Sequence, residues 1–519
     1  MNLTRPLKAL AAVALLLAAT ACQSAVDAQT AAGDASSPPR RGGVAEVGVN
    51  LDLVPANVFT NSNVAITTLV GLVYDTLVRH DREGLDPRPA LATAWQAADD
   101  GRTLTLELRQ GVKFHSGRPF TSADAKFSLE SYRDPRWNGQ LLSTAEVITA
   151  VEAPAPDRLV LRLEHPVSNL FDLLATVPVI DSESVADIAT GKRFVGTGPF
   201  AFTSWRPNTD LSFSRNAEYW DGPPHLDGVH VRVIPDGQSL LAAVRSGQVH
   251  LARGIGYRDA EAAAATPGLR AVQLDGAELQ AYVGLDTTAP GLSDPRVRRA
   301  VAHALDRDRI IEEVFRGRGY PTSLPWPRTS PAYDEGLDGR HRRDVGRAKA
   351  LLAEHGAPLP EIPLTYVGND RVFTAIAQIV QANLAEVGIA VKLEPVDSTQ
   401  FVKQLIGAQF TGLWTTNHSW AQLSPATLTV SAYPFNARRN ASHFSSPDYT
   451  AAAEAAWKLP AATGPAATAA YRAVSEQLLA GGFLAEIGVV FEQVVVRDAL
   501  QGVDWTRRRE LDLAGAHLR

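Results

Sequence analysis

The chain has a single cysteine and a single methionine among its 519 residues. One cysteine excludes an internal disulfide and a site built from several thiolates. Recognisable catalytic motifs are missing as well: there is no G-x-S-x-G elbow, no H-E-x-x-H helix, no Walker A loop and no G-x-G-x-x-G after a predicted strand. The twelve histidines include no pair at helical ligand spacing. We therefore expect a protein that is not an enzyme and carries no cofactor.

An excess of positive charge is also missing. Lysine and arginine number 50 against 56 acidic residues, which gives a formal net charge of −6. Nucleic-acid binding needs a basic surface, so this composition argues against it. No segment reaches the ~20 apolar residues that a membrane-spanning helix requires. We expect a monomer that is associated with a membrane, if at all, only through an attached lipid.

The first 22 residues indicate export. Arg5 and Lys8 precede an apolar run, and the small residues of Ala18-Ala19-Thr20-Ala21 lead to Cys22. This order is typical of a secretory signal peptide. The segment resembles a bacterial lipobox, although Ala19 stands where leucine is usual. We expect cleavage before Cys22 and lipidation of that residue; an incidental small residue at a cleavage site is the alternative.

Residues 23–42 are small, polar and proline-containing, which predicts a flexible tether between lipid and folded part. From the signal peptide and the expected lipid we predict a location in the periplasm or cell envelope. Gln23 follows the cysteine instead of an aspartate, so nothing argues for retention in the inner membrane. Which membrane holds the anchor stays open.

The remaining residues mix strand and helix patterns. Alternating hydrophobicity predicts strands at 103–108, 158–163 and 229–234. A helix at 238–246 ending at Gly247, followed by a strand near 249–251, forms a β-α-β unit. A second unit has a helix capped by Asp344 and ended by Gly356, a strand at 362–367, a helix at 372–387 and a strand at 389–393. Asp294-Pro295 opens a further helix at 297–305. Such units far apart in sequence predict two α/β lobes with a cleft between them.

Several blocks of residues resemble the family-5 extracellular solute-binding proteins, the peptide/nickel/opine-binding group of bacterial ABC importers. The blocks are 73–77 (VYDTL), 89–92 with Trp95, 99–101, 108–117 (LRQGVKFHSG), 120–124 (FTSAD), 196–200 (GTGPF), 215–216, 219–220, 246–247, 294–300 and 304–307. They follow in the family's order and cover nearly the whole mature chain. Most are turn or core motifs, so they indicate a fold more than a ligand.

The resemblance implies a two-lobed periplasmic-binding-protein fold with an extra inserted domain. We expect a discontinuous lobe I from residues 43–75, 196–280 and 485–519, an inserted domain II from 76–195 and lobe III from 281–484. Such a protein captures a small ligand by hinge closure and delivers it to the permease. The alternatives are a binding protein that signals to a membrane receptor, or a secreted hydrolase, for which no catalytic set is present.

The family also implies where the ligand lies. Peptide-binding relatives often carry an aspartate for the ligand's α-ammonium in a loop that corresponds to 414–425 here, and this stretch has no acid. No acidic residue occurs between Asp397 and Asp448, whereas several basic residues do. One interpretation is a basic surface balanced elsewhere. The other is an anionic, peptide-like or opine-like ligand, or a metal chelate to which His418 donates a nitrogen.

The expected cleft residues come from both lobes. Aromatic rings would supply apolar walls, and polar and basic side chains would orient the ligand. The set is Asn61, Ser62, Asn63, Arg253, Tyr282, Trp414, Asn417, His418, Trp420, Arg438 and Arg439.

Overall fold

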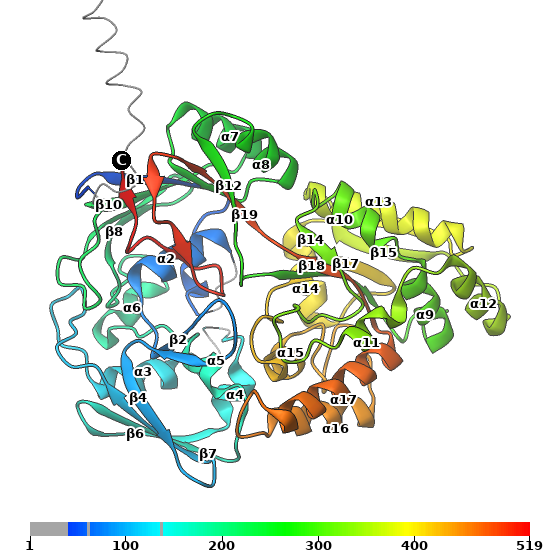
Figure 1. Cartoon of the computed structure of the whole chain (residues 1–519), viewed down its shortest axis with the longest axis horizontal. Coiled ribbons are helices and arrows are strands. Elements are labelled where there is room, and N and C mark those ends of the chain that lie inside the picture. The colour runs from blue at the N-terminus through cyan, green and yellow to red at the C-terminus, as the bar shows by residue number, and fades with distance from the viewer. Residues whose placement is uncertain (1–39, 60–62, 135–136, 138) are drawn as a thin grey trace, which may run out of the picture.

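The computed structural model describes residues 40–59, 63–134, 137 and 139–519. The expected signal peptide, Cys22 and nearly all of the tether lie outside the described residues, as do Asn61 and Ser62. No helix among the described residues is long and apolar enough to cross a bilayer. Figure 1 shows two bodies side by side, one coloured blue to green with the red C-terminal segment and the other green to orange.

The first body contains a seven-stranded mixed sheet. Its order is β12 (Leu269–Gln273), β19 (Gln493–Arg497), β11 (Leu251–Arg253), β1 (Val44–Val49), β10 (Gly228–Val233), β9 (Asp210–Arg215) and β8 (Phe200–Arg206). The central strand β1 pairs in parallel with β10 on one side and β11 on the other. The β-α-β unit expected here therefore has β1 inserted between its two strands. Its helices are α2 (Val64–Val73), α7 (Gly237–Ser246) and α8 (Tyr257–Ala264).

A four-stranded antiparallel sheet lies at the other end of this body. It is built from β4 (Ala92–Ala97), β5 (Thr103–Leu108), β7 (Arg158–Leu163) and β6 (Ile148–Ala155). Its helices are α3 (Ser122–Tyr132), α4 (Leu142–Glu146), α5 (Leu170–Leu174) and α6 (Val185–Ile188). One hydrophobic core runs from this sheet into the seven-stranded sheet. The two sheets therefore belong to one packed unit.

The second body is built on a six-stranded sheet (Figure 1). Its order is β14 (Gly319–Pro321), β18 (Leu484–Val490), β13 (Leu279–Leu285), β17 (Leu413–His418), β15 (Ile362–Val367) and β16 (Val391–Val396). The helices are α9 (Pro295–Ala304), α10 (Arg307–Glu313), α11 (Glu335–Asp338), α12 (Val345–His355), α13 (Arg371–Glu386), α14 (Ser398–Gly407), α15 (Pro425–Ser431), α16 (Pro447–Trp457) and α17 (Pro465–Gly481). Two hydrophobic clusters fill this body.

Three short ribbons complete the first body: β2 (Val78–His80) with β3 (Pro87–Pro89), β20 (Leu500–Gln501) with β23 (His517–Leu518), and β21 (Asp504–Trp505) with β22 (Leu511–Asp512). The ribbon of β21 and β22 packs against α2. A Cβ on Gly71 would lie 2.2 Å from the carbonyl oxygen of Leu511. Only glycine permits this approach, which brings the C-terminal segment 500–519 onto the first body.

The predicted helix ends agree with the structure where the signal is local. The Asp294 and Asp344 side chains cap α9 and α12, and Gly247 and Gly356 end α7 and α12 in the left-handed conformation. Two predicted strands begin later than expected, β11 at Leu251 and β16 at Val391. In both places the residues after the helix first donate backbone hydrogen bonds to its last carbonyls, as Val249 does to Ala243.

Candidate ligand-binding site between the lobes

Two neighbouring segments connect the two bodies, and they run side by side. Gln273 at the end of β12 pairs with Gln493, and Leu279 at the start of β13 pairs with Val490. Between these pairs the amide of Leu274 donates to the carbonyl of Glu492 at 2.9 Å. A narrow two-chain connection of this kind lets two lobes rotate about one axis, because few backbone angles need to change.

The lobes are closed on each other at the side where the four-stranded domain meets α15. The Asp172 carboxylate is buried, and its Oδ2 accepts hydrogen bonds from the Ser424 amide at 2.9 Å and the Thr427 hydroxyl at 2.6 Å. Asn169 donates to the same hydroxyl at 3.0 Å and accepts from the Trp457 indole at 2.9 Å. Buried polar groups hold the two bodies together here, and water is excluded from them.

A second contact lies nearer the hinge. Arg507, in the C-terminal segment, donates from Nη1 to the carbonyl of Gln422 at 2.7 Å. The Gln422 side chain donates back to the carbonyl of Arg507 at 2.9 Å. Trp420 precedes this contact and packs against the cores of both bodies. Trp420 therefore lies at the junction of the lobes.

The end of β17 faces this junction. Thr416, Asn417 and His418 are partly exposed, whereas the beginning of the strand is buried. The His418 ring makes edge contacts with Trp420 and Phe435 at centroid distances of 5.6 and 5.8 Å. Its Nδ1 is covered and has no hydrogen-bond partner among the described residues. Burial, with a smaller contribution from the charge of Arg509, lowers the pKa of His418 to about 3. The imidazole is therefore neutral and offers a lone pair.

Arg253 lies inside the first body, between α2 and the C-terminal segment. Its side chain is 1% exposed. Nη1 donates to the Thr68 hydroxyl on α2 at 2.8 Å, and Nη2 donates to the carbonyl of Arg509 at 2.6 Å. Burial lowers the pKa of Arg253 to about 10, so the group remains charged at neutral pH. The structure thus makes Arg253 a connection between α2 and the C-terminal segment, and not an exposed lip of the cleft.

Arg509 lies close enough to the junction for its charge to act on His418. Its guanidinium is partly exposed and lies 3.4 Å from Glu492, which belongs to the hinge. Asn63 stands at the start of α2, where its Oδ1 accepts from the amides of Ala65 and Ile66 at 3.0 Å each. An asparagine in this role fixes the beginning of the helix. Its side-chain amide nitrogen lies 3.5 Å from the carbonyl of Asp52.

Four expected residues lie away from the junction. Tyr282 and Trp414 are 0% exposed in the core of the second body, where Trp414 stacks on Phe410 at 4.5 Å. Their strands are central in the sheet and covered on both faces, so the rings are buried. Arg438 and Arg439 are exposed, and Arg438 pairs with Glu454 at 2.8 Å. These two arginines belong to the outer surface.

Metal-binding clusters are absent from the described residues: no group of three His, Cys, Asp or Glu side chains there could hold an ion. The residues that sequence reasoning missed are Asp172, Gln422, Arg507, Arg509 and Glu492. Each acts through a partner that is distant in sequence, as in the pair of Asp172 and Thr427, so no local pattern reveals them. The run Arg507-Arg508-Arg509 was the one available signal, since buried arginines need several acceptors.

Comparisons with known proteins agree with this architecture. Residues 86–435 match the family model described as bacterial extracellular solute-binding proteins, family 5. The oligopeptide-binding protein AppA of Bacillus subtilis is 26% identical over 413 residues, covering 74% of this chain and 75% of the relative. Di/tripeptide-binding protein 2 of Pseudomonas aeruginosa is 30% identical over 348 residues, covering 61% and 65%.

Solved structures show the same fold. AgaA from A. tumefaciens R10, in complex with agropinic acid, superposes with a TM-score of 0.80 at 24% identity and covers 92% of this chain and 99% of its own. NikA from Brucella suis with Fe(III)-EDTA gives a TM-score of 0.80 at 22% identity, with coverage of 92% and 100%. The expected two-lobed fold is confirmed. On the family match, which spans most of the chain, this protein belongs to the bacterial extracellular solute-binding proteins of family 5.

Proposed function

We propose that this chain is the substrate-binding component of an ABC importer. It captures a small ligand between its lobes, closes over it and presents the closed form to a permease, and it makes or breaks no bond. The observation that carries this proposal is the closed junction, where Trp420 contacts both cores beside a two-chain hinge. Closure couples binding free energy to a shape that a partner can recognise. The peptide-binding names of the relatives support it.

The ligand that fits best is small, peptide-like or opine-like and carries carboxylate. Asn417, near the end of β17, stands in the stretch where peptide-binding relatives often carry an acid for the ligand's ammonium, and no acid occurs between residues 398 and 447. The Arg509 guanidinium is partly exposed, pairs with Glu492 at 3.4 Å and acts by its charge on His418. Neutral His418 accepts an N–H of the ligand instead of pairing with a carboxylate by charge. The agropinic acid of one structural neighbour and the di/tripeptides of one relative have this chemistry.

A metal chelate is the second candidate, and His418 is the reason. Its covered Nδ1 has no partner among the described residues, and a neutral imidazole is a metal ligand. Because the described residues hold no three-ligand cluster, the chelator must supply most of the coordination. Structural neighbours solved with Fe(III)-EDTA and with Ni(L-His) support this arrangement.

We further propose the domain division and the anchor. Lobe I comprises 43–75, 196–280 and 485–519, domain II 76–195 and lobe III 281–484. The three large sheets support this division except at two edges, because β18 (Leu484–Val490) and the first residues of β13 (Leu279–Leu285) lie in the sheet of the second body. Lipidation of Cys22 would hold the protein to a membrane as a monomer. A sensing role remains the alternative to import, because a closed lobe pair can also trigger a receptor.

Isothermal titration calorimetry on the purified protein tests the ligand class. The probes are trialanine, N-acetyl-trialanine, agropinic acid and the Ni²⁺–histidine complex. We expect binding of at least one, weakened about tenfold or more by Trp420→Ala, since a truncated central aromatic often costs ~2 kcal/mol or more. Trp95→Ala, on β4, is the matched control. If Trp420→Ala leaves the affinity unchanged, the ligand lies elsewhere. If none of the four probes binds the unmodified protein, the proposed ligand class is rejected.

A further inference from the structure

A separate pocket lies behind the C-terminal segment, on the first body. It is bounded by the end of α2, the ribbon strand β2 and residues 505–512, and its volume is about 170 Å³. One water occupies ~10–15 Å³ on such a measure, so the pocket holds a small molecule or a group of waters. Its lining does not include Asn417, His418 or Trp420. The pocket is therefore distinct from the site at the end of β17.

Three buried polar side chains that line this pocket have polar atoms without a hydrogen-bond partner among the described residues. The Tyr74 hydroxyl, the Thr176 hydroxyl and both ring nitrogens of His80 have no hydrogen-bond partner among the described residues. Tyr74 and Thr176 are each 5% exposed, and the His80 side chain is 4% exposed. His80 Nε2 lies 3.4 Å from Asp172 without forming a hydrogen bond. An unsatisfied buried polar group costs ~1–3 kcal/mol, so three together indicate an occupant.

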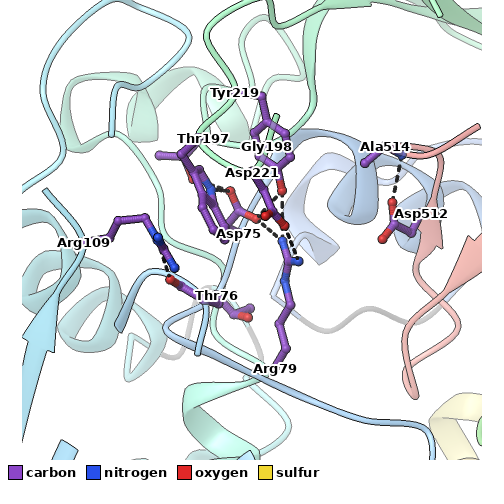
Figure 2. A network of polar contacts seen from close by, with 12 residues as sticks. Asp75, Thr76, Arg79, Arg109, Thr197, Gly198, Tyr219, Asp221, Asp512 and Ala514 are labelled. Atoms are coloured by element: carbon purple, nitrogen blue, oxygen red, sulfur yellow. Dashed lines mark hydrogen bonds and ion pairs between the residues drawn. The ribbon is translucent and has the colours of Figure 1, made fainter. Parts of the chain in front are cut away.

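The charged side chains around the pocket already have hydrogen-bond partners within the protein. Asp75 accepts from Arg79 at 2.6 Å and from the Tyr219 hydroxyl at 3.1 Å, as Figure 2 shows. Arg508 donates to the carbonyl of Thr176 at 2.8 Å. Asp512, at the right of Figure 2, accepts from the Ala514 amide at 2.9 Å.

The remaining charged side chains of the lining also have partners within the protein. Arg507 donates to three backbone carbonyls, and Glu510 accepts from the Thr506 hydroxyl. Three arginines and three acids therefore line the pocket in balance. A charged ligand would disturb these contacts, whereas an uncharged one would not.

We propose that this pocket is a second binding site, for an uncharged, hydroxyl-rich small molecule such as a polyol or monosaccharide. Hydroxyls donate and accept at once, which matches two unpartnered protein hydroxyls and an imidazole. The Trp505 ring and the aliphatic residues of the lining suit the C–H groups of such a molecule.

The pocket is complete only when the lobes are closed. Leu423 of the second body forms part of its wall, and Arg507 in the same wall makes the reciprocal contact with Gln422. A molecule in the pocket therefore favours closure, and by thermodynamic linkage a ligand in the main cleft tightens polyol binding to the same degree. The site needs no particular chemistry in the main cleft, so it stands or falls separately from the proposed function.

Saturation-transfer NMR with glycerol, myo-inositol and D-glucose as probes tests the site directly. We expect transfer from the protein to at least one probe. The double variant Tyr74→Phe, Thr176→Val removes two hydroxyls with little change of shape and should weaken that binding about tenfold or more.

The matched control is Tyr282→Phe, which removes another unpartnered buried hydroxyl from the core of the second body. It should leave polyol binding unchanged. The proposal is overturned if none of the probes receives saturation, which would mean that the pocket holds water only. It is equally overturned if the double variant binds the probe as the unmodified protein does.

Discussion

Arg507 and Gln422 exchange hydrogen bonds across the junction of the two lobes. The guanidinium donates to the glutamine carbonyl at 2.7 Å, and the glutamine side chain donates to the arginine carbonyl at 2.9 Å. Both side chains are almost fully buried. This pair exists only when the lobes are closed, so it contributes to the stability of the closed form and not to the stability of either lobe.

Gln422→Ala removes one of these two bonds. A neutral hydrogen bond contributes ~0.5–1.5 kcal/mol, so we expect the open fraction to rise several-fold with little change in melting temperature. Small-angle X-ray scattering measures this as a larger radius of gyration. Gln381→Ala removes a similar bond, to the carbonyl of Val391, inside the second body and should leave the radius unchanged. An equal radius for both variants would contradict the role of Gln422.

Asp172→Asn tests the contact between the four-stranded domain and α15. The carboxylate accepts from Ser424 and Thr427, and bonds to a charged acceptor contribute ~1.5–3 kcal/mol each. We expect the variant to open the lobes more than Gln422→Ala does, again by scattering. Asp157→Asn, whose partner Gln110 lies on the surface, is the control. A compact Asp172→Asn protein would show that this contact does not hold the lobes together.

Asn417→Asp, near the end of β17, tests the absence of an acid from the stretch 414–425. We expect the unmodified protein to bind trialanine and N-acetyl-trialanine with similar affinity, because no carboxylate at position 417 pairs with a free ammonium. The new aspartate should favour trialanine by about tenfold, in line with a charge-assisted hydrogen bond of ~1.5–3 kcal/mol. Calorimetry of both peptides gives the ratio. A strong preference for the free amine before substitution would mean that another acid holds it.

Local signals in the sequence predict much of the fold. An aspartate before a helix and a glycine after it act through backbone groups within four residues, so Asp344 and Gly356 define α12 in any context. The family blocks predict the two lobes for a different reason, since they hold the scaffold together. Asp75 of the first block accepts from Arg79, Thr197, Tyr219 and Trp220, which come from three separate blocks or their neighbours.

The site is less predictable, because burial depends on which strand is central. Trp414 and Trp420 lie six residues apart on the same segment, yet one is buried in the sheet and the other spans the junction. The same holds for Arg253 and Arg509, of which the first is 1% exposed and the second is partly exposed. Pairing across the lobes decides these outcomes, and the sequence alone carries no record of it.

Glu486 on β18 provides a test by pH. It is buried, neither carboxyl oxygen has a hydrogen-bond partner among the described residues, and burial raises its pKa to about 8. The folded protein therefore keeps a proton that the unfolded chain loses near pH 4.5. The raised pKa of Glu486 makes its full contribution to the free energy of folding below pH 4.5. This contribution is lost progressively as the pH rises towards 8.

Glu486→Gln should accordingly stabilise the protein at pH 8 and have little effect at pH 4.5. Chemical denaturation at both values measures the difference. Glu476→Gln, on the surface of α17, should show no such dependence. A Glu486→Gln protein that is less stable at pH 8 than the unmodified one would show that the carboxylate is ionised and paired in the fold.

Cys22→Ser tests the anchor. We expect the unmodified protein to enter the detergent phase of a Triton X-114 extraction and the variant to remain in the aqueous phase. Acyl chains bring ~0.8 kcal/mol per buried CH₂, and the serine cannot carry the thioether that attaches them. Aqueous partition of the unmodified protein would contradict lipidation.

The most direct test of the central claim is native mass spectrometry of the protein isolated from its own cells without denaturation. The claim is that the closed lobes enclose a small ligand beside Trp420 and His418. We predict a mass above that of the denatured protein, by the mass of a carboxylate-bearing peptide, opine or chelate, and its loss in Trp420→Ala. A native mass equal to the denatured mass, with lobes closed by scattering, would contradict the account.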